Sequence, residues 1–124
     1  LQFNIRRIYS SPPSHGGHVV DIVMNDEVLF NEWVQEVYVM RDRIKDMRQK
    51  LRDSLEAKLP GRSFEYITKQ NGVFSYTGLT PEQVARIIKD FGIYMVANGR
   101  ISVAGLNASN IDYVANAMAE VLKD

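Results

Sequence analysis

The sequence predicts an α/β chain in which a long N-terminal helix packs on a small mixed sheet with two further helices, an α+β-like small domain. Three observations lead to this fold class. An apolar stripe with spacings of three and four residues runs through positions 26–58. Short alternating stretches separated by turn sequences follow Pro60-Gly61. A capping-box sequence at Thr80 and a second apolar repeat after Asn107 predict two more helices.

The composition narrows the class of protein. The chain has 124 residues, of which 45% are hydrophobic and 24% charged, which is typical of a folded domain. Fifteen Lys and Arg balance fifteen Asp and Glu, so we expect no nucleic-acid partner. The longest apolar run has five residues, so we expect no membrane partner. The absence of cysteine excludes disulfides and thiolate metal sites, and the start at Leu1 suggests a piece of a longer protein.

The first 25 residues predict an extended segment followed by a short helix. Leu1, Phe3 and Ile5 alternate with polar residues, which is typical of a half-buried strand. Two prolines at positions 12 and 13 end the extended segment, predicted over residues 1–13. The apolar residues near position 20 predict a helix over residues 14–24.

A helix over residues 26–58 is the strongest periodic prediction. Asn25 or Asp26 can cap its start, and Pro60-Gly61 stops it. Residues 41–58 carry seven positive and four negative side chains with interleaved signs, which is typical of a solvated face. A basic patch and a coiled-coil dimer are the alternatives for this helix. The stripe consists of Phe30, Trp33, Val37, Met40, Ile44, Met47 and Leu51.

The remaining residues predict short strands and two helices. Thr80 to Gln83 form a capping box with proline at the first helical position, and Gly92 ends that helix. Asn107 can cap a final helix that runs to about Leu122. The predicted strands are residues 63–69, 73–77, 93–96 and 100–104, with turns at 70–72 and 97–99.

Few residues suggest chemistry on their own. The glycine-rich nucleotide motifs and the nucleophile-elbow motif are absent. His15 and His18 have no obvious third ligand, so a solvated turn is favoured over a metal site. Arg100 follows Gly99 at the start of an apolar strand, where a guanidinium can grip a planar carboxylate. A surface or ion-paired role is the alternative for Arg100 and for Arg6, and core packing is the alternative for Phe74.

Four stretches in register resemble one known family over essentially the whole chain. They resemble the C-terminal part of the aspartate and aromatic amino-acid aminotransferases, which are pyridoxal-phosphate enzymes of fold type I. Position 11 is Ser where many aspartate enzymes have Asn, which slightly favours the aromatic branch. The stretches are Ile5-Arg6 leading into Tyr9-Ser10-Ser11-Pro12-Pro13, then Met47-Arg48-Gln49, then residues 69–79, and then residues 91–95 running on to 98–105.

The resemblance implies four site residues. Arg100 is expected to bind the substrate's α-carboxylate, and Phe74 to form the aromatic wall of the substrate pocket. Arg6 is expected to reach across a homodimer interface and bind the side-chain carboxylate of aspartate or glutamate. Ser10, in the same cross-subunit loop, is expected to contact the cofactor of the neighbouring subunit.

The resemblance also implies what lies outside this chain. The catalytic Schiff-base lysine of the family lies upstream, in a serine-rich setting that none of the six lysines here has. We therefore expect pyridoxal 5'-phosphate in the full-length enzyme and not on this fragment, which we predict to be inactive alone. No catalytic residue and no metal are expected in this chain.

The domain prediction follows from the same resemblance. Residues 1–25 are expected to end the large cofactor-binding domain, 26–58 to form an interdomain helix and 59–124 to form the small domain. The implied reaction moves an amino group between aspartate, or an aromatic amino acid, and 2-oxoglutarate. A cytoplasmic location is expected, with the mitochondrion as the alternative. The alternative function is a stand-alone helical binding or dimerisation module.

Overall fold

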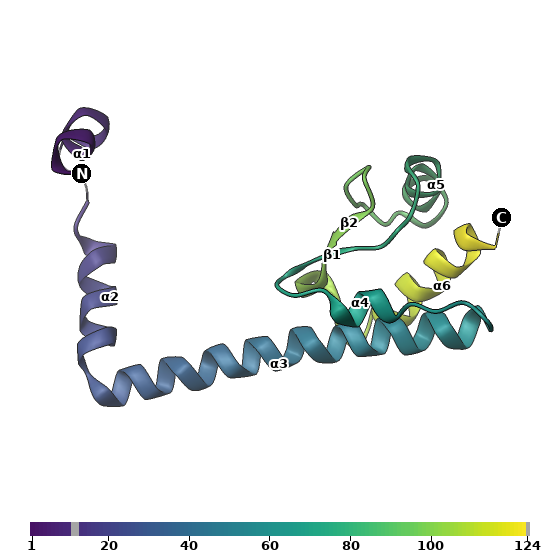
Figure 1. The fold of residues 1–124 in the computed structure, drawn as a ribbon, viewed down its shortest axis with the longest axis horizontal. Coiled ribbons are helices and arrows are strands. Elements are labelled where there is room, and N and C mark those ends of the chain that lie inside the picture. Colours follow the sequence, from purple (N-terminus) through teal and green to yellow (C-terminus); the bar gives the residue numbers. More distant parts are fainter. Residues whose placement is uncertain (11–12, 124) are drawn as a thin grey trace. The chain divides into compact units, whose positions relative to one another are not determined.

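The computed structural model describes residues 1–10 and 13–123 and confirms the fold class, helices with one small sheet (Figure 1). It divides into two compact units, Leu1–Met40 and Arg41–Asp124, and the division falls within the longest helix. The assignment of large, interdomain and small domains stays a prediction. The elements in chain order are α1 (Gln2–Tyr9), α2 (His15–Asn25), α3 (Glu27–Lys58), α4 (Glu65–Lys69), β1 (Phe74–Tyr76), α5 (Pro81–Phe91), β2 (Arg100–Ser102), the 3-10 turn η1 (Val103–Gly105) and α6 (Ile111–Leu122).

The first unit is helical throughout its described elements. The prediction of an extended segment over residues 1–13 was wrong, because residues 2–9 form α1. A lone strand would leave its backbone groups without partners, whereas a helix pairs them within the segment. An interaction between Arg7 and the Phe3 ring, 5.3 Å from guanidinium carbon to centroid, adds to the helix. The predicted short helix is confirmed as α2.

The long helix α3 begins and ends as the sequence predicts. The Asp26 carboxylate accepts hydrogen bonds from the backbone N–H groups of Val28 and Leu29, at 2.9 and 3.0 Å, and so caps the helix. The apolar stripe is exposed at Phe30 and Trp33 in the first unit and buried at Met47 in the second. Among the described residues, no helix is long and apolar enough to cross a membrane.

The second unit contains the hydrophobic core. The prediction of a strand over residues 63–69 was wrong, because Phe64 and Ile67 turn to the core at helical spacing and residues 65–69 form α4. The guanidinium of Arg52 on α3 reaches the Thr68 hydroxyl of α4 at 3.2 Å. The most deeply buried apolar residues of the core are Leu51, Leu55, Phe64, Ile67, Val84, Ile87, Val103, Ala115, Ala117 and Val121.

The sheet pairs β1 with β2. It is antiparallel, with Phe74 opposite Ser102 and Tyr76 opposite Arg100, where the sequence predicted a mixed sheet. The predicted strand at 93–96 is wrong, although Ile93 and Met95 are more buried than their neighbours, because no strand of the described residues pairs with it. The last strand is shorter than predicted, since residues 103–105 turn into η1.

Two helices complete this unit. Helix α5 is confirmed with both hydrogen bonds of its capping box and with Gly92 in the left-handed conformation at its end. Helix α6 is confirmed, but it begins at Ile111 after the N-cap Asn110. The Asn107 side chain instead accepts hydrogen bonds from Ser109 and Asn110 in the preceding turn.

Replacing Thr80 by alanine is expected to destabilise the second unit. The Thr80 hydroxyl accepts the Gln83 N–H at 3.3 Å, and the Gln83 side chain accepts the Thr80 N–H at 3.0 Å. Thr80→Ala removes the cap and is expected to lower the free energy of unfolding by about 1 kcal/mol. Urea unfolding of both chains measures this difference. Thr80→Ser keeps the hydroxyl and should unfold like the unchanged chain; an equal loss in both variants would contradict the capping role.

Candidate functional site

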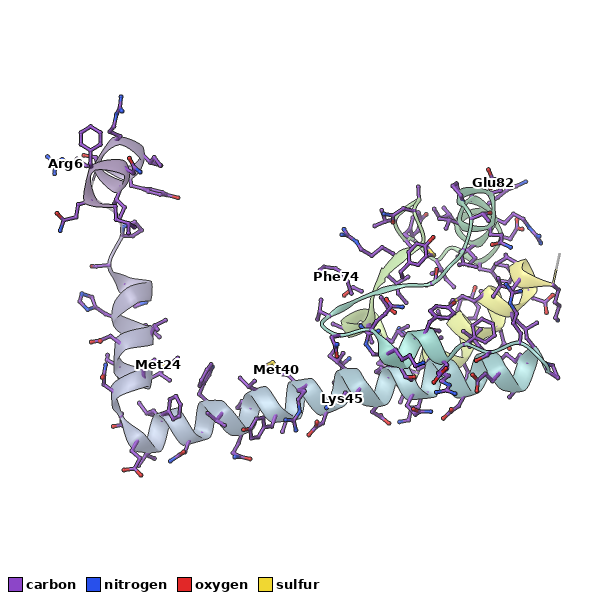
Figure 2. The ribbon with its side chains drawn as sticks, viewed as in Figure 1. Arg6, Met24, Met40, Lys45, Phe74 and Glu82 are labelled. Atoms are coloured by element: carbon purple, nitrogen blue, oxygen red, sulfur yellow. The ribbon has the colours of Figure 1, made fainter. Side chains whose placement is uncertain are left out.

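The candidate site lies on the two-stranded sheet, where Arg100 and Phe74 meet. Arg100 opens β2 opposite Tyr76, and Phe74 lies diagonally across the sheet on β1 (Figure 2). The guanidinium carbon of Arg100 lies 4.9 Å from the centre of the Phe74 ring, within the range of a cation–π interaction. Phe74 and Tyr76 are each 54% exposed, so the alternative of core packing for Phe74 is wrong.

The guanidinium of Arg100 has its hydrogen-bond donors available. Among the residues that the structure describes, no carboxylate forms an ion pair with it and no acceptor takes a hydrogen bond from it. Its backbone N–H donates to the Asn98 side chain at 3.1 Å, which fixes the main chain at the start of β2. The alternative of an ion-paired role is therefore not realised within the described chain.

Gly99 fixes the main chain just before Arg100. It is buried and has φ +82°, in the left-handed region that favours glycine. A side-chain Cβ at this position would lie 2.9 Å from the Leu79 carbonyl oxygen and 3.2 Å from the Thr77 hydroxyl. The Gly99 carbonyl accepts two hydrogen bonds from Thr77, one from its N–H at 3.0 Å and one from its hydroxyl at 2.7 Å. The conformation before Arg100 therefore depends on glycine.

A cavity of about 510 Å³ opens beside this pair. Arg100 is the one charged side chain among the described residues that line it. Two polar side chains in the lining are already engaged: the Tyr113 hydroxyl donates to the Phe91 carbonyl at 2.8 Å, and Asn110 donates to the Gly105 carbonyl at 2.9 Å. The apolar side chains in the lining are Phe74, Ile93, Met95, Val96, Ile101, Leu106 and Val114.

This arrangement suits one kind of ligand group. A guanidinium presents parallel N–H donors in a plane and binds a carboxylate with two hydrogen bonds. The Phe74 ring supports one face of the guanidinium, and the apolar lining accommodates the carbon skeleton attached to the carboxylate. The site can therefore hold a small organic carboxylate.

Arg48 supports β1 from the interior. Its guanidinium donates four hydrogen bonds, to the Ile67 carbonyl and the Ser75 hydroxyl through Nη1 and to the Gly72 and Phe74 carbonyls through Nη2. Burial lowers the pKa of the Arg48 guanidinium below its ordinary value. The sequence placed Arg48 on a solvated helix face, and this was wrong because its side chain is 3% exposed.

Gln70 holds the backbone of Tyr76. Its side-chain oxygen accepts the Tyr76 N–H at 2.7 Å, and its side-chain nitrogen donates to the Tyr76 carbonyl at 3.0 Å. The amide thus pairs with the backbone N–H and C=O groups of Tyr76 as a neighbouring strand would, so these two groups at the edge of the small sheet are hydrogen-bonded. The sequence indicated only a turn at residues 70–72.

Arg6 lies in the other unit, on α1 (Figure 2), and Ser10 directly follows that helix. Within the described chain, the exposed Arg6 side chain makes no ion pair or side-chain hydrogen bond. Ser10 ends the helix with φ +60°, and its N–H donates to the Arg6 carbonyl at 3.2 Å. Positions 11 and 12 of the resembling stretch lie outside the described residues. The structure brings Arg100 and Phe74 together, whereas the roles of Arg6 and Ser10 stay predictions.

The histidines and lysines of the described chain form no site for a metal or for a cofactor aldehyde. His15 and His18 are exposed on α2, and no group of three metal-binding side chains occurs among the described residues. Each of the six lysines is exposed or half-buried, and none lines the cavity beside Arg100.

Comparison with known proteins gives a family match over most of the chain. The sequence model of the family described as aminotransferase class I and II matches residues 1–118. An aromatic-amino-acid aminotransferase of Escherichia coli is 49% identical over 122 residues, which are 98% of this chain and 31% of that protein. A mitochondrial aspartate aminotransferase of Arabidopsis thaliana is 50% identical over 123 residues, which are 99% of this chain and 29% of that protein.

A solved structure agrees with the fold. It is a psychrophilic aromatic amino-acid aminotransferase from Psychrobacter sp. B6, cocrystallised with aspartic acid, and it superimposes with a TM-score of 0.94 at 71% identity. The match covers 97% of this chain and 30% of that one. The chain thus spans about 30% of the length of the relatives it matches.

Proposed function

Because the chain belongs to the aminotransferase class I and II family, we propose that it forms the C-terminal part of a pyridoxal-phosphate-dependent aminotransferase. The reaction moves an amino group between aspartate, or an aromatic amino acid, and 2-oxoglutarate. One observation carries the proposal: Arg100 is the one charged group lining an apolar cavity, with its donors unused among the described residues. Every substrate and product of this reaction has a carboxylate that such an arginine can bind.

Arg100 and Phe74 have the role of orienting the substrate. Two parallel hydrogen bonds from Arg100 to the α-carboxylate fix both the position and the plane of that group. Holding the substrate in a fixed orientation lowers the reaction barrier because the reacting bond is kept near its productive direction. The Phe74 ring keeps the guanidinium in place and excludes water from one of its faces.

The residues of this chain do not fit the cofactor by themselves. None of the lysines lines the cavity beside Arg100, and among the described residues that line it there is no acidic side chain to pair with a pyridine nitrogen. The pyridoxal group, when bound to the complete enzyme, supplies an electron-withdrawing ring. We therefore assign the cofactor site to parts of the polypeptide beyond this chain, with Ser10 as a contact from the neighbouring subunit of a homodimer.

Both substrate classes are supported by the relatives. The E. coli and Arabidopsis relatives are named for aromatic amino acids and for aspartate, and the Psychrobacter enzyme, named for aromatic amino acids, was crystallised with aspartic acid. We assign the chain to the aromatic branch with dicarboxylates also accepted. The cytoplasm is the proposed location, and the mitochondrion is the alternative because the Arabidopsis relative is a mitochondrial enzyme.

The test is an amino-transfer assay on the complete polypeptide and on this chain alone. The complete protein with pyridoxal phosphate is expected to transfer the amino groups of aspartate and phenylalanine to 2-oxoglutarate. The chain alone is expected to transfer neither. A polypeptide that consists of these 124 residues in the cell would favour the binding or dimerisation module instead.

Replacing Arg6 by alanine is expected to separate the two substrate classes. If Arg6 binds the side-chain carboxylate, Arg6→Ala lowers kcat/KM for aspartate by about a hundredfold and changes that for phenylalanine little. Steady-state kinetics on the complete enzyme measures both values. The neighbouring Arg7→Ala is the control, since Arg7 contacts Phe3 within its own helix. An equal loss for both substrates would contradict the role given to Arg6.

A further inference from the structure

We propose that Arg48 is a positioning residue for the substrate carboxylate. Its hydrogen bond to the backbone carbonyl of Phe74 fixes the position of the aromatic ring against which the Arg100 guanidinium lies. This inference rests on the proposed function of Arg100 as the carboxylate-binding group. Arg48 itself is buried and does not line the cavity, so it acts through Phe74 rather than on the substrate.

The hydrogen bonds of Arg48 fix its guanidinium in direction as well as in position. Nη1 donates to the Ile67 carbonyl and the Ser75 hydroxyl, both at 2.9 Å. Nη2 donates to the Gly72 carbonyl at 2.9 Å and to the Phe74 carbonyl at 2.7 Å. Each terminal nitrogen has two N–H groups, so all four are used. The planar group therefore holds the end of α4 and the beginning of β1 in one arrangement.

The charge of Arg48 makes this arrangement costly to replace. A buried cation is unfavourable unless it is hydrogen-bonded, and among the described residues no carboxylate pairs with this one. Three backbone carbonyls and one hydroxyl stabilise it instead. Lysine would keep the charge, but its three donors diverge from a single atom and cannot reproduce the planar fork.

The contacts of Phe74 explain how Arg48 affects the site. The Phe74 ring is half exposed and lies outside the core, so its position follows its backbone. That backbone is held at its own carbonyl by Arg48, and the preceding Val73 carbonyl accepts the Val103 N–H at 2.8 Å in the pairing of the two strands. The Phe74 ring in turn contacts the Arg100 guanidinium, whose central carbon lies 4.9 Å from the ring centre. Weakening the hydrogen bond between Arg48 and the Phe74 carbonyl therefore moves the aromatic ring that supports the Arg100 guanidinium.

The experiment compares Arg48→Lys in two backgrounds of the complete enzyme. The dissociation constant of succinate, an unreactive dicarboxylate, and the KM for aspartate are measured with Phe74 present and with Phe74→Ala. We expect Arg48→Lys to raise both constants about tenfold when Phe74 is present, since small misplacements of binding groups have effects of this order or larger. With Phe74→Ala we expect Arg48→Lys to add little, because its route to Arg100 is already removed.

Two further variants separate positioning from loss of structure. Arg52→Lys changes an arginine on the same helix whose bonds go to Glu56 and Thr68, and it should leave succinate binding unchanged. If Arg48→Lys fails to fold, Ser75→Ala replaces it, since it removes one acceptor and leaves three. Its expected effect is about threefold on the dissociation constant, again lost with Phe74→Ala.

The outcomes are distinct. An equal rise in the succinate dissociation constant in both backgrounds, or no rise at all, would overturn the positioning role while leaving the proposed function in place. A complete enzyme that neither binds succinate nor transfers amino groups would overturn the proposed function, and this inference with it.

Discussion

Arg100→Lys is expected to lower kcat/KM for aspartate and for phenylalanine alike, by about a hundredfold or more, in the complete enzyme. Both substrates carry an α-carboxylate, so both lose the planar two-bond contact although the positive charge remains. The variant should fold normally, because the Arg100 side chain is exposed and its side-chain contact within the described chain is with the Phe74 ring. Steady-state kinetics and urea unfolding test the two parts of this expectation.

Arg62→Lys is a matched control for this change. Arg62 also lies over an aromatic ring, that of Phe64 at 5.7 Å, and it does not line the cavity. The same substitution at Arg62 changes a similar ring contact, together with a hydrogen bond to the Leu122 carbonyl at 3.1 Å, and should leave kcat/KM nearly unchanged. If Arg100→Lys retained full activity, or affected one substrate only, Arg100 would not be the group that binds the α-carboxylate.

Gly99→Ala is expected to cause the largest loss of stability among single-methyl changes in this unit. The added Cβ would lie 2.9 Å from the Leu79 carbonyl oxygen, a backbone atom that cannot move aside alone. A positive φ costs roughly 1 to 2 kcal/mol for alanine and the overlap roughly 1 to 3 kcal/mol, so we expect the free energy of unfolding to fall by about 3 kcal/mol. Arg100 directly follows, so carboxylate binding should weaken as well.

Gly92→Ala separates the two costs. Gly92 also has a positive φ, +65°, but a Cβ there would meet no atom within 4 Å. Its substitution should therefore cost about 1 kcal/mol, from the backbone conformation alone. Urea unfolding of both variants measures the difference. Similar losses for the two would contradict the close packing at Gly99.

The elements that the sequence predicts well are those with local signals. Helix α3 begins at a capping aspartate, and α5 has a full capping box and a terminal glycine, so each boundary is encoded within a few residues. Helices α1 and α4 were missed because a short alternating run does not distinguish a strand from a helix. Residues 93–96 have a strand-like pattern of burial, but strand formation needs a partner elsewhere in the chain.

Only part of the candidate site could be predicted from the sequence. Residue patterns alone left Arg100 and Phe74 open between a site and ordinary packing, and the family resemblance selected them. The role of Arg48 was missed because its acceptors lie 19 to 27 residues away and three of them are backbone carbonyls. Because every residue has a backbone carbonyl, the sequence does not reveal which carbonyls act as acceptors. A solvated arginine on a charged helix face and a buried, hydrogen-bonded arginine therefore cannot be told apart from the sequence.

A crystal structure of the complete protein with bound succinate tests the central claim most directly. We expect one carboxylate of the ligand to accept two parallel hydrogen bonds from Arg100, at about 2.7 to 2.9 Å. The guanidinium should keep its place over the Phe74 ring. A ligand bound elsewhere, with Arg100 paired to a carboxylate of the protein, would contradict the role of this arginine and the function proposed from it.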